Sequence, residues 1–145
     1  MFGAGAITPA VKFLLIANTA VFFLQLFLPS EILLLFGLVP SMVWHDFYFW
    51  QLFTYQFLHG GLFHLLFNML AVWMFGCDLE RRWGSSFFLR YYFVSVVGGG
   101  ILNALLVPGQ IVPSIGASAG VYGILLAYGL IYPNRIVYFY FLFPF

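Results

Sequence analysis

The chain has 145 residues, of which 64% are hydrophobic, 23% are aromatic and only 6% are charged. A soluble domain carries about 25% charged residues, so the composition indicates an integral membrane protein with a single domain over residues 1–145. The net charge of +1, without a basic stretch, argues against nucleic acid as a partner, and the single Cys77 excludes an internal disulfide.

The hydropathy pattern predicts an all-α membrane protein with about five transmembrane helices. The expected spans run from about Val11 to Leu28, Leu62 to Cys77, Phe87 to Val107 and Ser114 to Tyr132, with a fifth that begins at Ile136 and stops at Phe145. A crossing needs about 20 residues, so we expect the fifth helix to be incomplete and the natural gene product to continue through a sixth. A signal peptide is the alternative for the first span, but Lys12 alone makes a weak positive region, and a retained helix is preferred.

Two connections have a distinctive composition. The segment from Ser30 to Leu58 is crowded with aromatic and scattered polar residues, which predicts short amphipathic helices in the membrane interface. The segment from Asp78 to Ser86 is the most polar of the chain, and within it Glu80, with Arg81 and Arg82, is expected to form a cytoplasmic turn held by ion pairs. Gly98 to Gly100 are interpreted as helix-packing residues and Asn103 as an interhelical hydrogen-bonding group.

The cations predict the topology. They all fall at span ends that alternating crossings place on one face: Lys12, Arg81, Arg82, Arg90 and Arg135. The positive-inside rule then puts the N-terminus in the cytoplasm and the aromatic connection outside. In this arrangement the start of the second span and Ser118 lie near the same outer surface.

His64 and Asn68 are four residues apart and therefore share one face of the second span. One interpretation is that they hydrogen-bond neighbouring helices, and spacing alone favours it. Another is that they donate hydrogen bonds to a developing oxyanion. A metal site from His45, Asp46, His59 and His64 is a third alternative, without the close ligand spacing of known sites.

Ser118 has a similar ambiguity, because it lies among small residues in Gly116-Ala117-Ser118-Ala119-Gly120. Such residues let helices approach closely, and spacing alone favours this packing role. The alternative is a buried nucleophile, which requires a base to activate the hydroxyl.

The run from His59 to Asn68, HGGLFHLLFN, followed by Gly116-Ala117-Ser118 on a later span, resembles the rhomboid family of intramembrane serine proteases. The likeness extends over nearly the whole chain and includes the aromatic outward connection, the turn from Glu80 to Gly84, and Tyr122. It favours the active-site interpretation of both motifs.

The resemblance implies a role for each matched residue. Ser118 would be the nucleophile, and its backbone amide with the side chains of His64 and Asn68 would form the oxyanion site. Gly116 would let the backbone come close, His59 would have a supporting role, and Tyr122 would pack against the catalytic histidine.

Two positions depart from the family pattern. Ala119 replaces the usual glycine after the nucleophile, which is a small change. The general base of the family is a histidine on the sixth span, and no histidine of this sequence occupies that place. We therefore expect this 145-residue chain by itself to be inactive, since loss of a triad member costs several powers of ten in rate.

The resemblance thus implies a serine endopeptidase that cleaves transmembrane helices of single-pass membrane proteins near the outer surface through an acyl-enzyme, without a cofactor or metal. The expected location is the lipid bilayer of a bacterial inner membrane, with a multi-pass chain. A non-catalytic rhomboid-like protein that binds transmembrane helices is the alternative.

Overall fold

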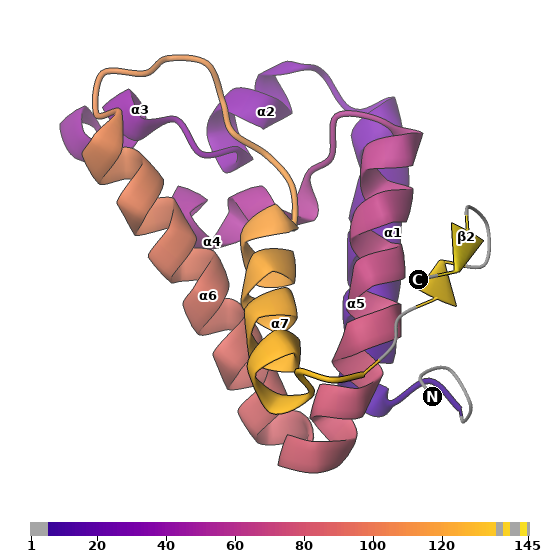
Figure 1. The fold of residues 1–145 in the computed structure, drawn as a ribbon. Coiled ribbons are helices and arrows are strands. Elements are labelled where there is room, and N and C mark those ends of the chain that lie inside the picture. The colour runs from indigo at the N-terminus through magenta and orange to yellow at the C-terminus, as the bar shows by residue number, and fades with distance from the viewer. Residues whose placement is uncertain (1–5, 136–137, 140–142, 145) are drawn as a thin grey trace.

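The computed structural model describes residues 6–135, 138–139 and 143–144. Four longer helices dominate it: α1 (Pro9–Phe27), α5 (Leu62–Trp83), α6 (Ser85–Leu106) and α7 (Ser118–Ile131). By length and composition, α1, α5 and α6 are apolar enough to cross a membrane, and α7 is a shorter apolar helix. Helix α5 packs against α1 on one side and α7 on the other, with α6 against α7 (Figure 1). The mainly helical membrane fold is confirmed.

The connection between α1 and α5 contains the expected short helices. They are α2 (Glu31–Phe36), α3 (Pro40–His45), α4 (Gln51–Thr54) and the 3₁₀ helix η1 (Tyr55–Phe57). The fully buried Gln51 holds this segment together, because its side-chain oxygen accepts from the Val39 amide at 3.0 Å and its nitrogen donates to the Leu34 carbonyl at 2.8 Å.

The polar stretch from Asp78 to Ser86 is not a loop, which corrects the expected end of the second span at Cys77. Helix α5 continues to Trp83, and only Gly84, with a φ of 84°, separates it from α6. The buried Glu80 explains the extra turn. Its carboxylate accepts from the Ala10 and Val11 amides at 2.8 and 3.0 Å and so caps the N-terminus of α1, where backbone N–H groups lack intrahelical partners.

Helix α7 begins four residues later than predicted, at Ser118 instead of Ser114. The backbone of Ser114 instead pairs with Leu38 in both directions, at 2.9 and 2.8 Å. Gly116 has a φ of 116°, which a helix cannot contain. The 14 residues of α7 therefore rise about 21 Å, compared with about 33 Å for the 22 residues of α6. Figure 1 shows the consequence, since the start of α7 lies well below the end of α6.

The described part of the expected fifth span forms extended strands instead of a helix. Tyr138–Phe139 (β1) and Phe143–Pro144 (β2) form a short antiparallel pair, and the other residues of that span lie outside the described ones. A helix of about ten residues is marginal without packing partners, and aromatic residues favour extended backbone.

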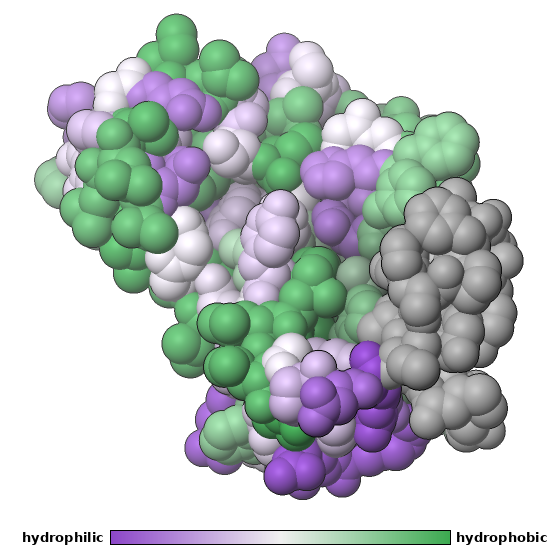
Figure 2. Space-filling model, in the orientation of Figure 1, coloured by the Kyte–Doolittle hydropathy of each residue, from purple (hydrophilic) through white to green (hydrophobic). Residues whose placement is uncertain are grey.

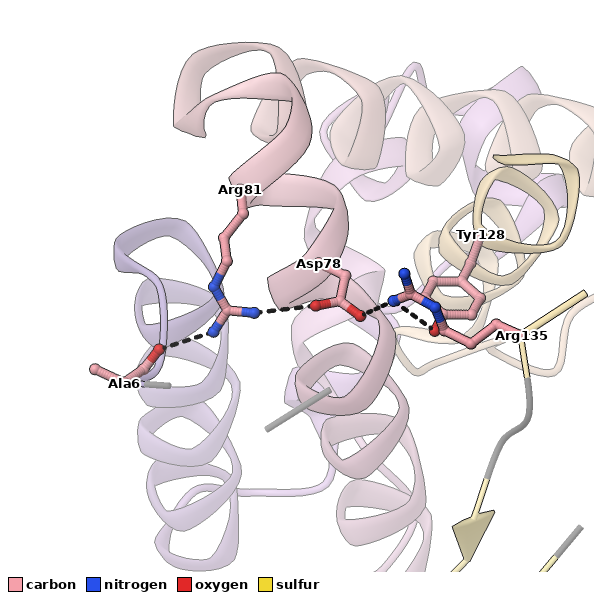
Figure 3. Close-up of polar contacts among 5 residues, drawn as sticks. All are labelled: Ala6, Asp78, Arg81, Tyr128 and Arg135. Atoms are coloured by element: carbon pink, nitrogen blue, oxygen red, sulfur yellow. Dashed lines mark hydrogen bonds and ion pairs between the residues drawn. The ribbon is translucent and has the colours of Figure 1, made fainter. Parts of the chain in front are cut away.

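Asp78 links three segments at the end of the molecule opposite Ser118. Its carboxylate pairs with Arg81 at 3.0 Å and with Arg135, beyond α7, at 2.8 Å, and Arg81 also donates to the Ala6 carbonyl at 3.2 Å (Figure 3). Hydrophilic residues gather at this end of the space-filling view, below an apolar surface (Figure 2).

Candidate active site

Ser118 is the first residue of α7 and is half-buried. The two amides before it are bonded to other segments, that of Gly116 to the Tyr55 carbonyl at 3.0 Å and that of Ala117 to Nε2 of His59 at 3.4 Å. The Ser118 amide belongs to the first helical turn, in which N–H groups have no intrahelical acceptor. The helix N-terminus thus offers a backbone donor beside the serine hydroxyl, in a position where negative charge is favoured.

The small residues after Ser118 pack α7 against α6. A Cβ built on Gly99 of α6 would lie 2.8 Å from the Ala119 side chain, and the Tyr92 ring fills the space beside Gly120. Ser118 itself lines a cavity instead. The packing interpretation therefore fits Gly120 and Ala119, whereas Ser118 lies at a cavity that Ala119 also lines.

His64 and Asn68 both lie against Gly116. A Cβ built on Gly116 would be 2.7 Å from Cε1 and 2.8 Å from Nε2 of His64, and 3.7 Å from Nδ2 of Asn68. The two side chains that sequence spacing puts on one face of α5 therefore meet the backbone two residues before Ser118. Only glycine fits there, because a side chain would collide with the imidazole and the φ of 116° disfavours it.

A hydrogen bond fixes the tautomer of His64. The Gly60 amide donates to Nδ1 at 3.2 Å, and a ring nitrogen that accepts a hydrogen bond carries no proton. The ring proton is then on Nε2, which is the nitrogen next to Gly116. His64 therefore presents an N–H donor toward the start of α7.

Asn68 presents a second donor. Its Nδ2 is buried and has no hydrogen-bond partner among the described residues. A buried amide without a partner costs about 1–3 kcal/mol, so such groups are rare and call for an explanation. An acceptor bound beside Gly116 would satisfy it.

His59 is fully buried next to this pair of donors. Its ring packs edge-on against His64 with a centroid distance of 5.0 Å. Burial, together with the nearby imidazole of His64, lowers the pKa of His59 to about 4. His59 is therefore a neutral imidazole at neutral pH, consistent with its acceptance of the Ala117 amide.

A cavity of about 290 Å³ lies beside Ser118. Its lining includes Ser114, Tyr122 and Asn103 as well as Ser118. Tyr122 is 71% exposed, and its expected packing against a catalytic histidine stays a prediction. The Oδ1 atom of Asn103 is buried without a partner in the described part of the chain, so the expected interhelical hydrogen bond from that oxygen is absent there.

The alternative metal site is not formed. No group of three or more His, Cys, Asp or Glu side chains suited to a metal ion occurs within residues 6–135, 138–139 and 143–144. His45 lies on α3, where its Nδ1 is 2.9 Å from the Ser41 carbonyl.

Gln25 is a residue of this site that sequence reasoning missed. Its side-chain nitrogen donates to the His59 carbonyl at 2.7 Å and its oxygen accepts from the His59 amide at 3.1 Å. A glutamine in an apolar span is the signal that could have drawn attention to it, because polar groups in such helices tend to face the protein interior.

Comparison with known proteins finds the rhomboid domain over residues 46–145. RHOMBOID-like protein 4 of Arabidopsis thaliana is 42% identical over 76 residues, 52% of this chain and 19% of that protein. Rhomboid protease GluP of Bacillus subtilis is 36% identical over 96 residues, 66% of this chain and 18% of the relative. Rhomboid-like protease 3 of Toxoplasma gondii is 34% identical over 98 residues, 67% of this chain and 36% of the relative.

The chain thus spans between about a fifth and about a third of the length of these relatives. The family match covers more than half of this chain and includes His59, His64, Asn68 and Ser118. The chain belongs to the rhomboid family.

Proposed function

We propose that this chain carries the nucleophile and the oxyanion site of an intramembrane serine endopeptidase. The hydroxyl oxygen of Ser118 attacks the carbonyl carbon of a peptide bond in a substrate helix. The peptide C–N bond then breaks, the amine leaves with a proton, and an acyl-enzyme remains on Ser118. Water hydrolyses this ester, which releases the carboxylate and restores the serine.

The observation that carries the proposal is the convergence of two donors on Gly116. His64 directs its Nε2–H there, and the Nδ2 of Asn68 is buried beside it without a partner in the described chain. With the first-turn amide of Ser118, these donors would bind the negative oxygen of the tetrahedral intermediate. Preorganised donors of this kind contribute about 3–4 kcal/mol each to acyl-transfer reactions.

No histidine of this sequence is placed to take the proton of Ser118. His59 accepts the Ala117 amide through Nε2, His64 carries its proton on the nitrogen that faces Gly116, and His45 is on α3. The family resemblance puts the base on a later span. The proposal therefore assigns this proton transfer to no residue between Met1 and Phe145.

The proposed substrates are transmembrane helices of single-pass membrane proteins, cut near the outer surface. A helix hides its carbonyls in hydrogen bonds, so it must unwind locally before Ser118 can attack. The short α7 supports a cleavage site that lies within the membrane near its outer surface. It sets Ser118 about 12 Å below the level that a helix as long as α6 would reach. The proposed topology has the N-terminus in the cytoplasm, as the cation distribution predicts, and the kind of membrane stays a prediction.

The test uses the natural full-length polypeptide in detergent and in liposomes. A fluorophosphonate probe should label the wild type and Ser114→Ala, whose serine lines the same cavity, but not Ser118→Ala. Cleavage of a single-pass membrane substrate should be lost in the same variant. Unchanged cleavage by Ser118→Ala refutes the assignment.

A wild-type protein that binds transmembrane helices without labelling or cleavage would instead indicate the non-catalytic alternative. Its retained binding would show that the protein in that experiment was folded.

A further inference from the structure

Gln25 holds the peptide unit of His59 from the neighbouring helix α1. Both ends of its side-chain amide are used, the nitrogen toward the His59 carbonyl at 2.7 Å and the oxygen toward the His59 amide at 3.1 Å. Two hydrogen bonds to one residue fix both the position and the orientation of the backbone there. They also satisfy polar backbone groups in a mainly apolar surrounding.

Two contacts of the candidate active site start from this fixed backbone. The His59 ring accepts the Ala117 amide, next to Ser118, at 3.4 Å. The following amide, of Gly60, donates to Nδ1 of His64 and so sets the tautomer of that ring. A shift of the backbone at residues 59 and 60 would therefore disturb His64 and the start of α7 together.

We propose that Gln25 is a positioning residue of the candidate active site, which keeps His64 in the tautomer that directs Nε2–H toward Gly116 and keeps the Ala117 amide in place. The effect on catalysis rests on the proposed function. The effect on the histidine rings does not.

The surroundings of Gln25 support a specific role for its amide. Gln25 lines an apolar cavity of about 230 Å³ between α1, α2 and η1, and the one other uncharged polar side chain of the lining, Thr54, is bonded to the Phe36 carbonyl. Packing alone would be served better by an apolar residue, because a polar amide in such a wall is costly without partners. The two partners of the Gln25 amide are both on His59.

The structure offers a matched control in Gln51. This glutamine also joins distant backbone groups, because its oxygen accepts from the Val39 amide and its nitrogen donates to the Leu34 and Leu35 carbonyls at 2.8 and 3.3 Å, and its amide does not bond His59. Loss of either amide should reduce stability by a similar amount. Only loss of the Gln25 amide should change the tautomer of His64 and the surroundings of the His59 ring.

The primary measurement is ¹⁵N NMR of the full-length protein labelled in histidine, with His59→Gln and His64→Gln to assign the signals. The ¹⁵N shifts distinguish ring nitrogens with and without a proton. The variants are Gln25→Met, which keeps the shape without the amide, Gln25→Glu, which keeps an acceptor for the His59 amide, and Gln51→Met.

In Gln25→Met we expect two spectral changes. His64 should become a mixture of tautomers, and the pKa of His59 should rise from about 4 toward the ordinary 6.5 as its ring gains access to water. His64 of α5 is the titratable group that faces His59, while Gln25 of α1 and the Ala117 amide face it without charge. The histidine signals of Gln25→Glu should lie between those of Gln25→Met and those of the wild type. The histidine signals of Gln51→Met should match those of the wild type.

Peptidase kinetics provide the second measurement. Gln25→Met should lower kcat by up to about 100-fold with little change in KM, because a misplaced oxyanion donor acts in the transition state. Histidine signals unchanged in Gln25→Met, or changed equally in Gln51→Met, would overturn the proposal. Cleavage retained by Ser118→Ala would overturn the proposed function instead, and would leave the spectral result for Gln25 standing.

Discussion

Gly116→Ala tests how closely the start of α7 approaches α5. The added methyl group would lie 2.7 Å from Cε1 and 2.8 Å from Nε2 of His64, distances that real Cβ atoms essentially never show. The φ of 116° adds a backbone cost of about 1–3 kcal/mol for a residue with a side chain. Overpacking of this kind costs a further amount of about 1–3 kcal/mol.

The protein can relieve the collision only by moving the imidazole of His64 or the backbone before Ser118. If the ring moves, the bond from Gly60 to Nδ1 is strained or lost, at about 1 kcal/mol, and the Nε2–H leaves its position. The backbone strain and the overpacking together therefore predict a destabilisation of about 2–6 kcal/mol, before any loss of this hydrogen bond. Serine labelling should fall by about 10²–10³-fold, the loss typical of one oxyanion donor.

The assay is unfolding in detergent, followed by circular dichroism, together with the rate of fluorophosphonate labelling of the full-length protein. Gly109→Ala is the control, because a Cβ there would meet nothing within 4 Å and its φ is not positive. If Gly116→Ala unfolds and labels like Gly109→Ala, the proposed contact between Gly116 and His64 is wrong.

Three further variants follow from the structure. Asn68→Leu should leave the free energy of unfolding unchanged or raised, because it removes a buried donor that has no partner in the described chain. The same variant should lower the labelling rate at least about 100-fold. A clear loss of stability would instead favour a structural role for Asn68. Glu80→Gln should destabilise the protein by about 3 kcal/mol in thermal unfolding, because the carboxylate accepts two backbone amides of α1, whereas the exposed Glu31→Gln should have no effect. For His59, the folded pKa of about 4 lies below the ordinary 6.5, so the unfolded state takes up the proton first. The free energy of unfolding should fall as the pH drops from about 6.5 to about 4, and His59→Gln should weaken that dependence when both proteins are unfolded across this range.

Much of the fold could be predicted from the sequence because hydropathy is a local property. The spans that became α1 and α6 were placed within about two residues at each end. The end of α5 was predicted six residues too early, since the polar residues after Cys77 look like a turn in the sequence. Their helical conformation depends on Glu80 reaching α1, a contact between residues 70 positions apart.

The candidate site could also be predicted from the sequence only in part. Helical spacing placed His64 and Asn68 on one face, and the topology argument placed that face near Ser118. The late start of α7 could not be predicted, because it depends on the pairing of Ser114 with Leu38 and on the φ of Gly116. The role of Gln25 could not be predicted either, since its partner His59 is 34 residues away.

These long-range contacts have a common physical cause. Because α7 is short, irregular backbone lies below the end of α6 (Figure 1), and any backbone N–H and C=O group at membrane depth needs a partner within the protein. The chain supplies them from distant segments. Gln51 bonds three backbone groups, Gln25 bonds two, and Trp44 donates to the Ala104 carbonyl at 2.8 Å. Other buried side-chain atoms of the described chain also lack a partner, among them Oδ1 of Asn18 and Nε2 of Gln56, so a missing partner does not by itself mark a site. The Nδ2 of Asn68 is distinguished by its position beside Gly116, two residues before Ser118, because an acceptor bound near the serine would supply the partner that it lacks in the described chain.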